Sequence, residues 1–303
     1  MGIPRVLNLW STHQFWIGLL GALGIDARRI EFSSDTSEAQ AREYGKGRGT
    51  VDCCYPVKCM SGHYGELLLR DKRPIDILLS PMIAALPSFL GGSVKASLAC
   101  PRVMAAPENI KAGFLKGDDV FARRGVRHLA PLVNLDEPDL AERQLHAALK
   151  EVIADLGPAE SARAVRAGYA ALAAFDRRLR DKSLELLAQC ARTQRPCLLV
   201  LARPYHVDAG IGHEIEVDLQ GHGYPVLWSH MLPLDAPLLD WMFGADIAAG
   251  RQRSALDIGD VWPSSYSANT NEILWAAKFA APLGARSSAC LLYTSDAADE
   301  EDS

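Results

Sequence analysis

Short apolar runs alternate with longer amphipathic segments along this chain, and this alternation limits the possible folds more than any other feature. The strand-like runs are at 5–9, 29–33, 76–81, 197–202 and 225–228, and the helix-like segments are at 13–23, 37–45, 52–70, 138–156, 159–192 and 211–220. Strands that alternate with helices are typical of a mostly parallel sheet covered by helices. The sequence therefore predicts an α/β protein.

The helical pattern is densest in the middle of the chain, where Gly157-Pro158 separates two helical segments. We predict two Rossmann-like doubly wound units with a helical connection between them. The first unit would occupy 1–135, the connection 136–195 and a second, truncated unit 196–289. A chain of 303 residues has the length expected for about two domains.

The last residues differ from the rest in character. The segment 290–300 is similar to the translation of a transposon-type sequencing adapter, in which TGT CTC TTA TAC ACA TCT encodes Cys-Leu-Leu-Tyr-Thr-Ser. A natural acidic tail is the alternative. We predict that 290–303 is a sequencing-adapter artefact and that the natural protein continues beyond 289, so that the chain is a fragment.

Charge and hydropathy exclude two classes of partner. The net charge is −5, but the last eight residues hold five acids, and without them 32 acidic side chains match 32 basic ones. A neutral body without a basic stripe argues against nucleic-acid binding. No stretch approaches the roughly 20 apolar residues that span a bilayer. Because the chain also lacks an export signal and its seven cysteines show no disulfide spacing, we expect a cytoplasmic protein with no membrane partner.

The cysteines near residue 54 form the densest cluster of unusual residues. Cys54 precedes Tyr-Pro-Val-Lys at the predicted start of a helix, where the helix dipole favours a thiolate and hence an anionic metal–thiolate centre. At about 100° per residue, Cys59 would point about 140° away from Cys54, which favours a place in the core. Cys53 precedes the helix, and an adjacent pair seldom binds one iron, so Cys53 is a substitute candidate.

Cys100 is the second candidate ligand, in the sequence Leu98-Ala-Cys-Pro-Arg-Val. A ligand followed by proline recurs at iron–sulfur sites. The chain has no Cys-x-x-Cys, which argues against a zinc ribbon. Buried cysteine is usually only a small hydrophobic residue. That alternative stays open for Cys100, and we predict a packing role for Cys190 and Cys197.

Other polar residues permit two interpretations. His206, Asp208 and His213 follow a strand end, where α/β proteins collect ligand-binding groups; they could contact a substrate or partner, or only stabilise the loop. The segment 262–272 resembles a polar loop that caps the next helix. The arginines of 159–192 are most simply a solvated face.

Several motifs resemble one family. In order, they are Gly2-Ile-Pro-Arg-Val-Leu, Phe15-Trp, Leu23-Gly, Phe32-Ser-Ser-Asp-Thr, Cys54-Tyr-Pro-Val-Lys, Gly62-His, Ile75-Asp-Ile-Leu-Leu-Ser-Pro, Arg203-Pro-Tyr-His-Val-Asp and Gly212-His-Glu. Together they resemble the activase-associated domain of large proteins related to the ATP-dependent activators of 2-hydroxyacyl-CoA dehydratases. The resemblance covers residues 1 to about 281.

The resemblance implies a redox role. In that family cysteines from more than one domain hold a [4Fe–4S] cluster, and Cys54 and Cys100 match the positions of two ligands. ATP would act only through activator domains that are absent here, because the chain has no Gly-rich phosphate loop; we expect no ATPase activity from it alone. The implied partners are those activator ATPase domains and a dehydratase-type subunit.

Three hypotheses follow for the function. The first is an iron–sulfur redox module that supports ATP-driven, low-potential electron transfer. The second is a docking domain without metal, which links the activator ATPase to its partner. The third is a self-contained cluster-dependent reductase. Whether this chain is itself an enzyme stays open.

Overall fold

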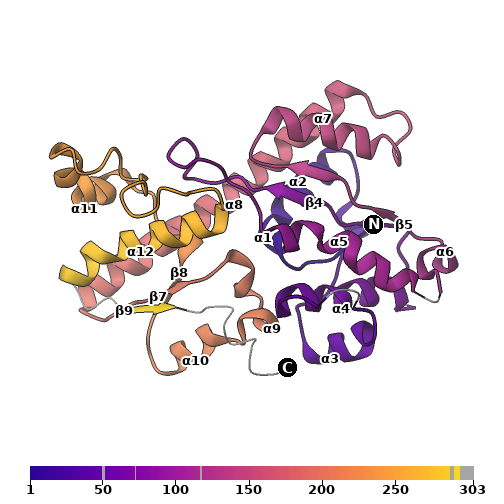
Figure 1. Ribbon diagram of the computed structural model, residues 1–303, viewed down its shortest axis with the longest axis horizontal. Helices are drawn as coiled ribbons and strands as arrows, with labels where there is room; N and C mark the ends of the chain where they lie inside the picture. Colours follow the sequence, from indigo (N-terminus) through magenta and orange to yellow (C-terminus); the bar gives the residue numbers. More distant parts are fainter. Residues whose placement is uncertain (50–51, 72, 117, 287–289, 294–303) are drawn as a thin grey trace.

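Four short parallel strands form the first sheet of the computed structural model, which describes residues 1–49, 52–71, 73–116, 118–286 and 290–293 (Figure 1). The strand order is β2-β1-β3-β5. The bounds are β1 (Gly2–Ile3), β2 (Glu31–Phe32), β3 (Ile77–Leu79) and β5 (Arg127–Leu129). Parallel neighbours need crossover connections, which the helices between these strands supply.

Two of these strands lead directly into a second parallel pair, β4 (Met82–Ala85) and β6 (Leu132–Asn134). Pro81 and Pro131 stand at the two steps. Proline has no N–H to give to the ladder, and the pairing resumes where Met82 N–H donates to the Pro131 carbonyl at 2.9 Å. After β4 the chain runs outward from the sheet as the loop 86–99.

Helices pack against both faces of this first sheet because successive strand residues point to opposite sides. Leu79 faces a core with Trp16 and Leu145, whereas Leu78 faces a core with Tyr64 and Phe114. The helical elements of the region are α1 (Asn8–Ser11), α2 (His13–Ala22), η1 (Ala27–Arg29), α3 (Glu38–Gln40), the π-turn η2 (Ala41–Gly45), α4 (Tyr55–Leu69), α5 (Pro101–Leu115) and α6 (Val120–Arg124).

Two helices, α7 (Pro138–Leu149) and α8 (Pro158–Thr193), connect the two sheets (Figure 1). The first part of α8 crosses α2 closely, where a Cβ added to Gly168 would lie 2.8 Å from the Phe15 carbonyl oxygen. Its last part places Cys190 in the core of the second sheet. A single helix of 36 residues thus belongs to both cores.

The second sheet holds three parallel strands in the order β8-β7-β9. They are β7 (Leu198–Leu201), β8 (Val226–Trp228) and β9 (Cys290–Tyr293), and the helical elements are η3 (Pro204–Val207), α9 (Ala209–Gly212), α10 (Ile215–Gly221), η4 (Ser229–Met231), α11 (Ala236–Ala248) and α12 (Ala268–Arg286). Residues 290–293 of the predicted adapter segment pair with β7, whereas 294–303 lie outside the described residues. The origin of that segment stays a prediction.

The predicted strand at 5–9 is wrong. β1 ends at Ile3, and α1 begins at Asn8 after Leu7 adopts a left-handed φ of 54°. Val6 N–H donates to the Pro4 carbonyl at 2.9 Å in a tight turn. The run is apolar because it is buried, and a short buried run does not by its pattern distinguish a strand from a turn.

The α/β class with parallel sheets is confirmed. The Rossmann-like, doubly wound character of each unit and the domain boundaries stay predictions. The loop 86–99, from the predicted first unit, contacts the segment before α12: Lys95 N–H donates to the Ser265 carbonyl at 3.0 Å, and Leu98 forms a parallel bridge with Ser267.

Candidate functional site

Cys54 and Cys100 occupy equivalent positions on two helices. Cys54 is the N-cap of α4 and Cys100 the N-cap of α5, and each helix has a proline in its first turn. Proline suits this turn because the first N–H groups of a helix have no partner within the helix. Cys54 thus begins a helix, as predicted. Cys100 also does so, although the sequence placed it only in a loop.

Both thiols are half-buried and pack against the same core as Cys53 and Tyr55. The charge of Arg102, on the first turn of α5, acts on Asp52 and on Cys53 just before α4. The starts of the two helices therefore lie near one another. Burial raises the pKa of Cys53, and the neighbouring Cys54 raises it further.

The environment of Cys100 favours the thiolate. Burial is the largest influence on the pKa of Cys100 and raises it, but the opposing influences together lower the pKa below its ordinary value. They are the backbone N–H groups of Val103 and Arg102 and the guanidinium of Arg203, which reaches Cys100 from the chain after β7. A lowered thiol pKa is typical of cysteines that bind metals or react as nucleophiles.

The thiols near the two helix starts do not amount to a complete metal site. In the described part of the chain, no three His, Cys, Asp or Glu side chains are grouped so that they could hold a metal ion. Cys53, the substitute candidate, lines a cavity of about 180 Å³ between α4 and α5. Cys59 is buried in the core of the first sheet, and Cys190 and Cys197 in that of the second.

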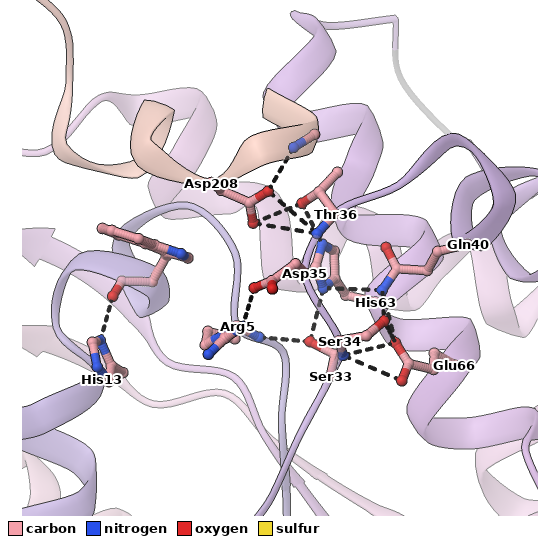
Figure 2. A network of polar contacts seen from close by, with 12 residues as sticks. Arg5, His13, Ser33, Ser34, Asp35, Thr36, Gln40, His63, Glu66 and Asp208 are labelled. Atoms are coloured by element: carbon pink, nitrogen blue, oxygen red, sulfur yellow. Dashed lines mark hydrogen bonds and ion pairs between the residues drawn. The ribbon is translucent and has the colours of Figure 1, made fainter. Parts of the chain in front are cut away.

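A chain of buried hydrogen bonds joins the loop after β2 to the segment after β7 (Figure 2). Thr36 Oγ1 donates to Asp208 Oδ2 at 2.9 Å, and Thr36 N–H donates to Asp208 Oδ1 at 3.2 Å. His63 Nε2 lies 2.9 Å from Thr36 Oγ1, and its Nδ1 lies 2.7 Å from Ser33 Oγ. Arg5 N–H donates to Ser33 Oγ at 2.8 Å.

These partners determine the proton positions on His63. Thr36 gives its hydroxyl proton to the Asp208 carboxylate, so His63 Nε2–H donates to Thr36 and the Ser33 hydroxyl donates to His63 Nδ1. Burial, and secondarily the charge of Arg5, lowers the pKa of His63 to about 3. A ring that stays neutral near pH 7 is poorly suited to acid–base chemistry. His63 therefore joins two parts of the fold.

We expect His63 to make stability depend on pH. Between its folded pKa of about 3 and its unfolded value near 6.5, only the unfolded chain binds the extra proton. The free energy of unfolding should therefore fall as the pH falls from about 6.5, by about 1.4 kcal/mol per pH unit for this histidine. Urea unfolding of the protein and of His63→Gln at pH 7 and pH 5 measures that difference.

The exposed His222 offers a matched control, and His222→Gln should keep the pH dependence of the unmodified protein. His128 and His230, which are partly buried, also have pKa values lowered by burial, to about 4 and about 3, so some dependence should persist in His63→Gln. An identical slope in His63→Gln and in the unmodified protein would contradict the assignment.

The segment 203–214 packs on the start of α4. Tyr55 donates its hydroxyl proton to the Gly210 carbonyl at 3.1 Å, and its ring stacks on His213 with centroids 5.6 Å apart. Asp208 caps α9 through Gly210 N–H at 3.1 Å. Of the two interpretations left open for His206, Asp208 and His213, loop stabilisation describes Asp208.

Sequence reasoning missed two parts of this site. Helix α5 was not predicted, although Pro101 at its first position and buried residues at 103, 106, 107, 110 and 114 have helical spacing. The position of Arg203 was also missed. It donates from Nη1 to the Tyr205 hydroxyl at 2.9 Å and acts on Cys100. Only the three-dimensional fold brings Arg203 to Cys100.

Among the described residues, no helix combines the length and apolar character that crossing a membrane requires.

Comparison with known proteins identifies the family. Searches of curated proteins and of solved structures gave no match. A sequence model described as CoA enzyme activase uncharacterised domain (DUF2229) matches residues 1–232, including the cysteine motifs and the segment 203–214. Since this match covers most of the sequence, the chain belongs to the CoA enzyme activase uncharacterised domain family.

Proposed function

We propose that this chain is the iron–sulfur redox module of a CoA activase-type protein, with Cys54 and Cys100 as two thiolate ligands of a [4Fe–4S] cluster. The main support is that both cysteines cap proline-initiated helices and pack against one core. When bound, such a cluster would accept and pass on single electrons.

The chemistry of the residues fits part of such a site. Helix N-termini favour anions, and Arg102 and Arg203 add positive charge near the thiols. An all-cysteine cluster takes four thiolates, and the described residues offer at most Cys53, Cys54 and Cys100 in this region. We therefore propose that the remaining ligands come from a second copy of the chain, so that the purified chain can complete the site. ATP hydrolysis would belong to separate activator domains.

Anaerobic reconstitution with ferrous iron and sulfide tests this function. We expect the purified chain to bind iron and sulfide in equal amounts and to become brown. We also expect Cys54 and Cys100 to become protected from iodoacetamide, as measured by mass spectrometry of tryptic peptides. Buried Cys59 should react little before or after reconstitution. Failure to bind iron, or unchanged alkylation of both candidate ligands, would contradict the proposal.

A docking domain without metal is the second candidate. It is favoured by the lack of a group of three metal-binding side chains among the residues that the structure describes. In that case the buried hydrogen bonds between Thr36 and Asp208 would hold together two segments of a rigid docking surface, and the cysteines would serve packing. The docking-domain hypothesis predicts no iron uptake, and no change in partner binding when Cys54 or Cys100 is replaced. A cytoplasmic location is part of both proposals.

A further inference from the structure

A larger cavity, of about 520 Å³, lies between α8, the loop 86–99, η4 and the start of α12, and none of the described cysteines lines it. Its volume falls in the range of about 300–1,000 Å³ that is typical of small-molecule sites. Leu86 follows β4, Pro204 follows β7 and His230 follows β8. The cavity therefore lies at the carboxyl ends of parallel strands, where open α/β sheets bind ligands.

Apolar side chains form a large part of the wall. They are Leu86, Phe89, Tyr169, Leu172, Leu184 and Leu234. They come from three parts of the chain that are far apart in the sequence, so folding creates a single apolar surface from separate segments. Such a wall can accept the carbon skeleton of a small ligand but does not orient it.

A basic group in the cavity is free to bind an anion. The guanidinium carbon of Arg180 lies 5.1 Å from the centre of the Phe89 ring, and its Nε is buried without a hydrogen-bond partner. The charge of Arg180 acts on Asp176 and Glu272, but among the described residues Arg180 forms no ion pair within 4 Å. Beside it, His230 Nδ1 is also shielded from solvent and lacks a partner. A carboxylate suits the planar donor fork of arginine.

Two carboxyl groups in the cavity form no ion pair within 4 Å among the described residues, although the charge of Arg180 acts on both. Ser88 donates to Glu272 Oε1 at 2.8 Å, but no basic side chain pairs with Glu272 or Asp176 in the described structure. Burial, and to a smaller degree the charge of Asp176, raises the pKa of Glu272 to about 7, although Ser88 and Arg180 oppose this. Burial likewise raises the pKa of Asp176, although the charge of Arg180 opposes this. A ligand cation would stabilise both ionised carboxylates.

We propose that this cavity binds a small zwitterion of the amino-acid class, with its ammonium between Asp176 and Glu272, its carboxylate on Arg180 and its side chain on the apolar wall. A simple anion would leave the two acids unpaired, and a simple cation would leave Arg180 unpaired. A zwitterion would pair with the two acids and with Arg180. The charged residues of the lining are Asp176, Arg177, Arg180, Asp181, Asp235 and Glu272, and their excess of acids favours a ligand that presents a cation.

Isothermal titration calorimetry with the proteinogenic amino acids at millimolar concentration tests this proposal. Each amino acid that binds is compared with the amine that lacks its carboxylate and the acid that lacks its amine, for example L-leucine with 3-methylbutylamine and 4-methylpentanoate. We expect at least one amino acid to bind, and both of its matched halves to bind about tenfold more weakly or worse, because each loses a charge-assisted hydrogen bond. Binding by no amino acid, or equal binding by either half, would overturn the proposal.

Variants locate the site. Arg180→Gln and Glu272→Gln should each weaken binding by about tenfold or more. Arg178→Gln and Glu185→Gln are matched controls on α8, because neither residue lines the cavity, and they should bind as the unmodified protein does. Circular dichroism identifies any variant that fails to fold. Unchanged affinity in both folded cavity variants would overturn the proposal.

Proton release on binding is a second readout, and it would not occur if Glu272 had only a structural role. The groups that act on Glu272 are Ser88 of the loop 86–99 and Asp176 and Arg180 of α8. The other titratable residues of the lining are Arg177, Asp181, His230 and Asp235. An ammonium needs the ionised carboxylate, so affinity should decrease as the pH falls below about 7, and binding near pH 7 should release protons. Calorimetry in two buffers of different ionisation enthalpy should show this release, and Glu272→Gln should abolish it. Binding of an amino acid without proton release would overturn the role of Glu272.

Discussion

We expect Cys54→Ala and Cys100→Ala each to lose most of the iron that the reconstituted protein binds, together with the visible charge-transfer absorption. Each variant removes one of the two thiols at the starts of α4 and α5. A cluster that has lost a ligand exposes an iron to solvent and loses the stabilisation supplied by that thiolate. Iron and sulfide analysis, with absorption spectra recorded under anaerobic conditions, measures the loss.

Three other thiols are controls for this experiment. Cys59, Cys190 and Cys197 are each at most 8% exposed, and burial raises the pKa of Cys197 to about 12. Their alanine variants should keep nearly all of the iron, at a small cost in stability. Cys53→Ala should be mild as well, since the pKa of that thiol is raised. If Cys54→Ala and Cys100→Ala kept full iron, these two cysteines would not be ligands and the proposed cluster site would be wrong.

The sequence was sufficient to predict those elements that local rules determine. Helix α2 ends close to the predicted Leu23, where Gly24 adopts a left-handed φ of 77°. Helix α4 begins beside Cys54, because Pro56 suits the first turn of a helix. The long helix α8 begins at the predicted break at Gly157-Pro158. In each case a glycine or proline marks the boundary within a few residues.

Contacts between distant segments were beyond sequence reasoning. Thr36 and Asp208 are 172 residues apart and form hydrogen bonds, and nothing in either local sequence indicates its partner. Arg180 looked like part of a solvated arginine face, yet it lines the 520 Å³ cavity. Glu272 looked like part of a capping loop, yet it lies opposite α8 in that cavity. Only the packing of α8 against both sheets brings such residues together.

We expect Gly210→Ala to destabilise the protein strongly. A Cβ at this position would lie 2.1 Å from the Thr36 carbonyl oxygen and 2.5 Å from its carbonyl carbon. Both are backbone atoms, so no side chain can move aside. Helix α9 would have to separate from the loop after β2, and the hydrogen bonds of Asp208 to Thr36 and of Tyr55 to Gly210 would lengthen or break.

The expected loss is about 3 kcal/mol, because overpacking of this kind costs about 1–3 kcal/mol and the lost hydrogen bonds to a carboxylate add to it. Urea unfolding measures the change. Gly21→Ala is the matched control: Gly21 lies in α2, no atom stands within 4 Å of an added Cβ, and alanine there should raise the stability by up to about 1 kcal/mol.

Asp208→Asn separates the two causes of the Gly210 effect. It preserves the space around Gly210 but removes the negative charge of the carboxylate that accepts hydrogen bonds from Thr36. The free energy of unfolding should fall by about 1–2 kcal/mol. A larger loss in Gly210→Ala than in Asp208→Asn would show that close packing of α9 on Thr36 contributes beyond the hydrogen bonds. Equal stability of Gly210→Ala and the unmodified protein would mean that the segment after β7 does not pack against the loop after β2 in solution. Arg203 would then lose the support that holds it beside Cys100.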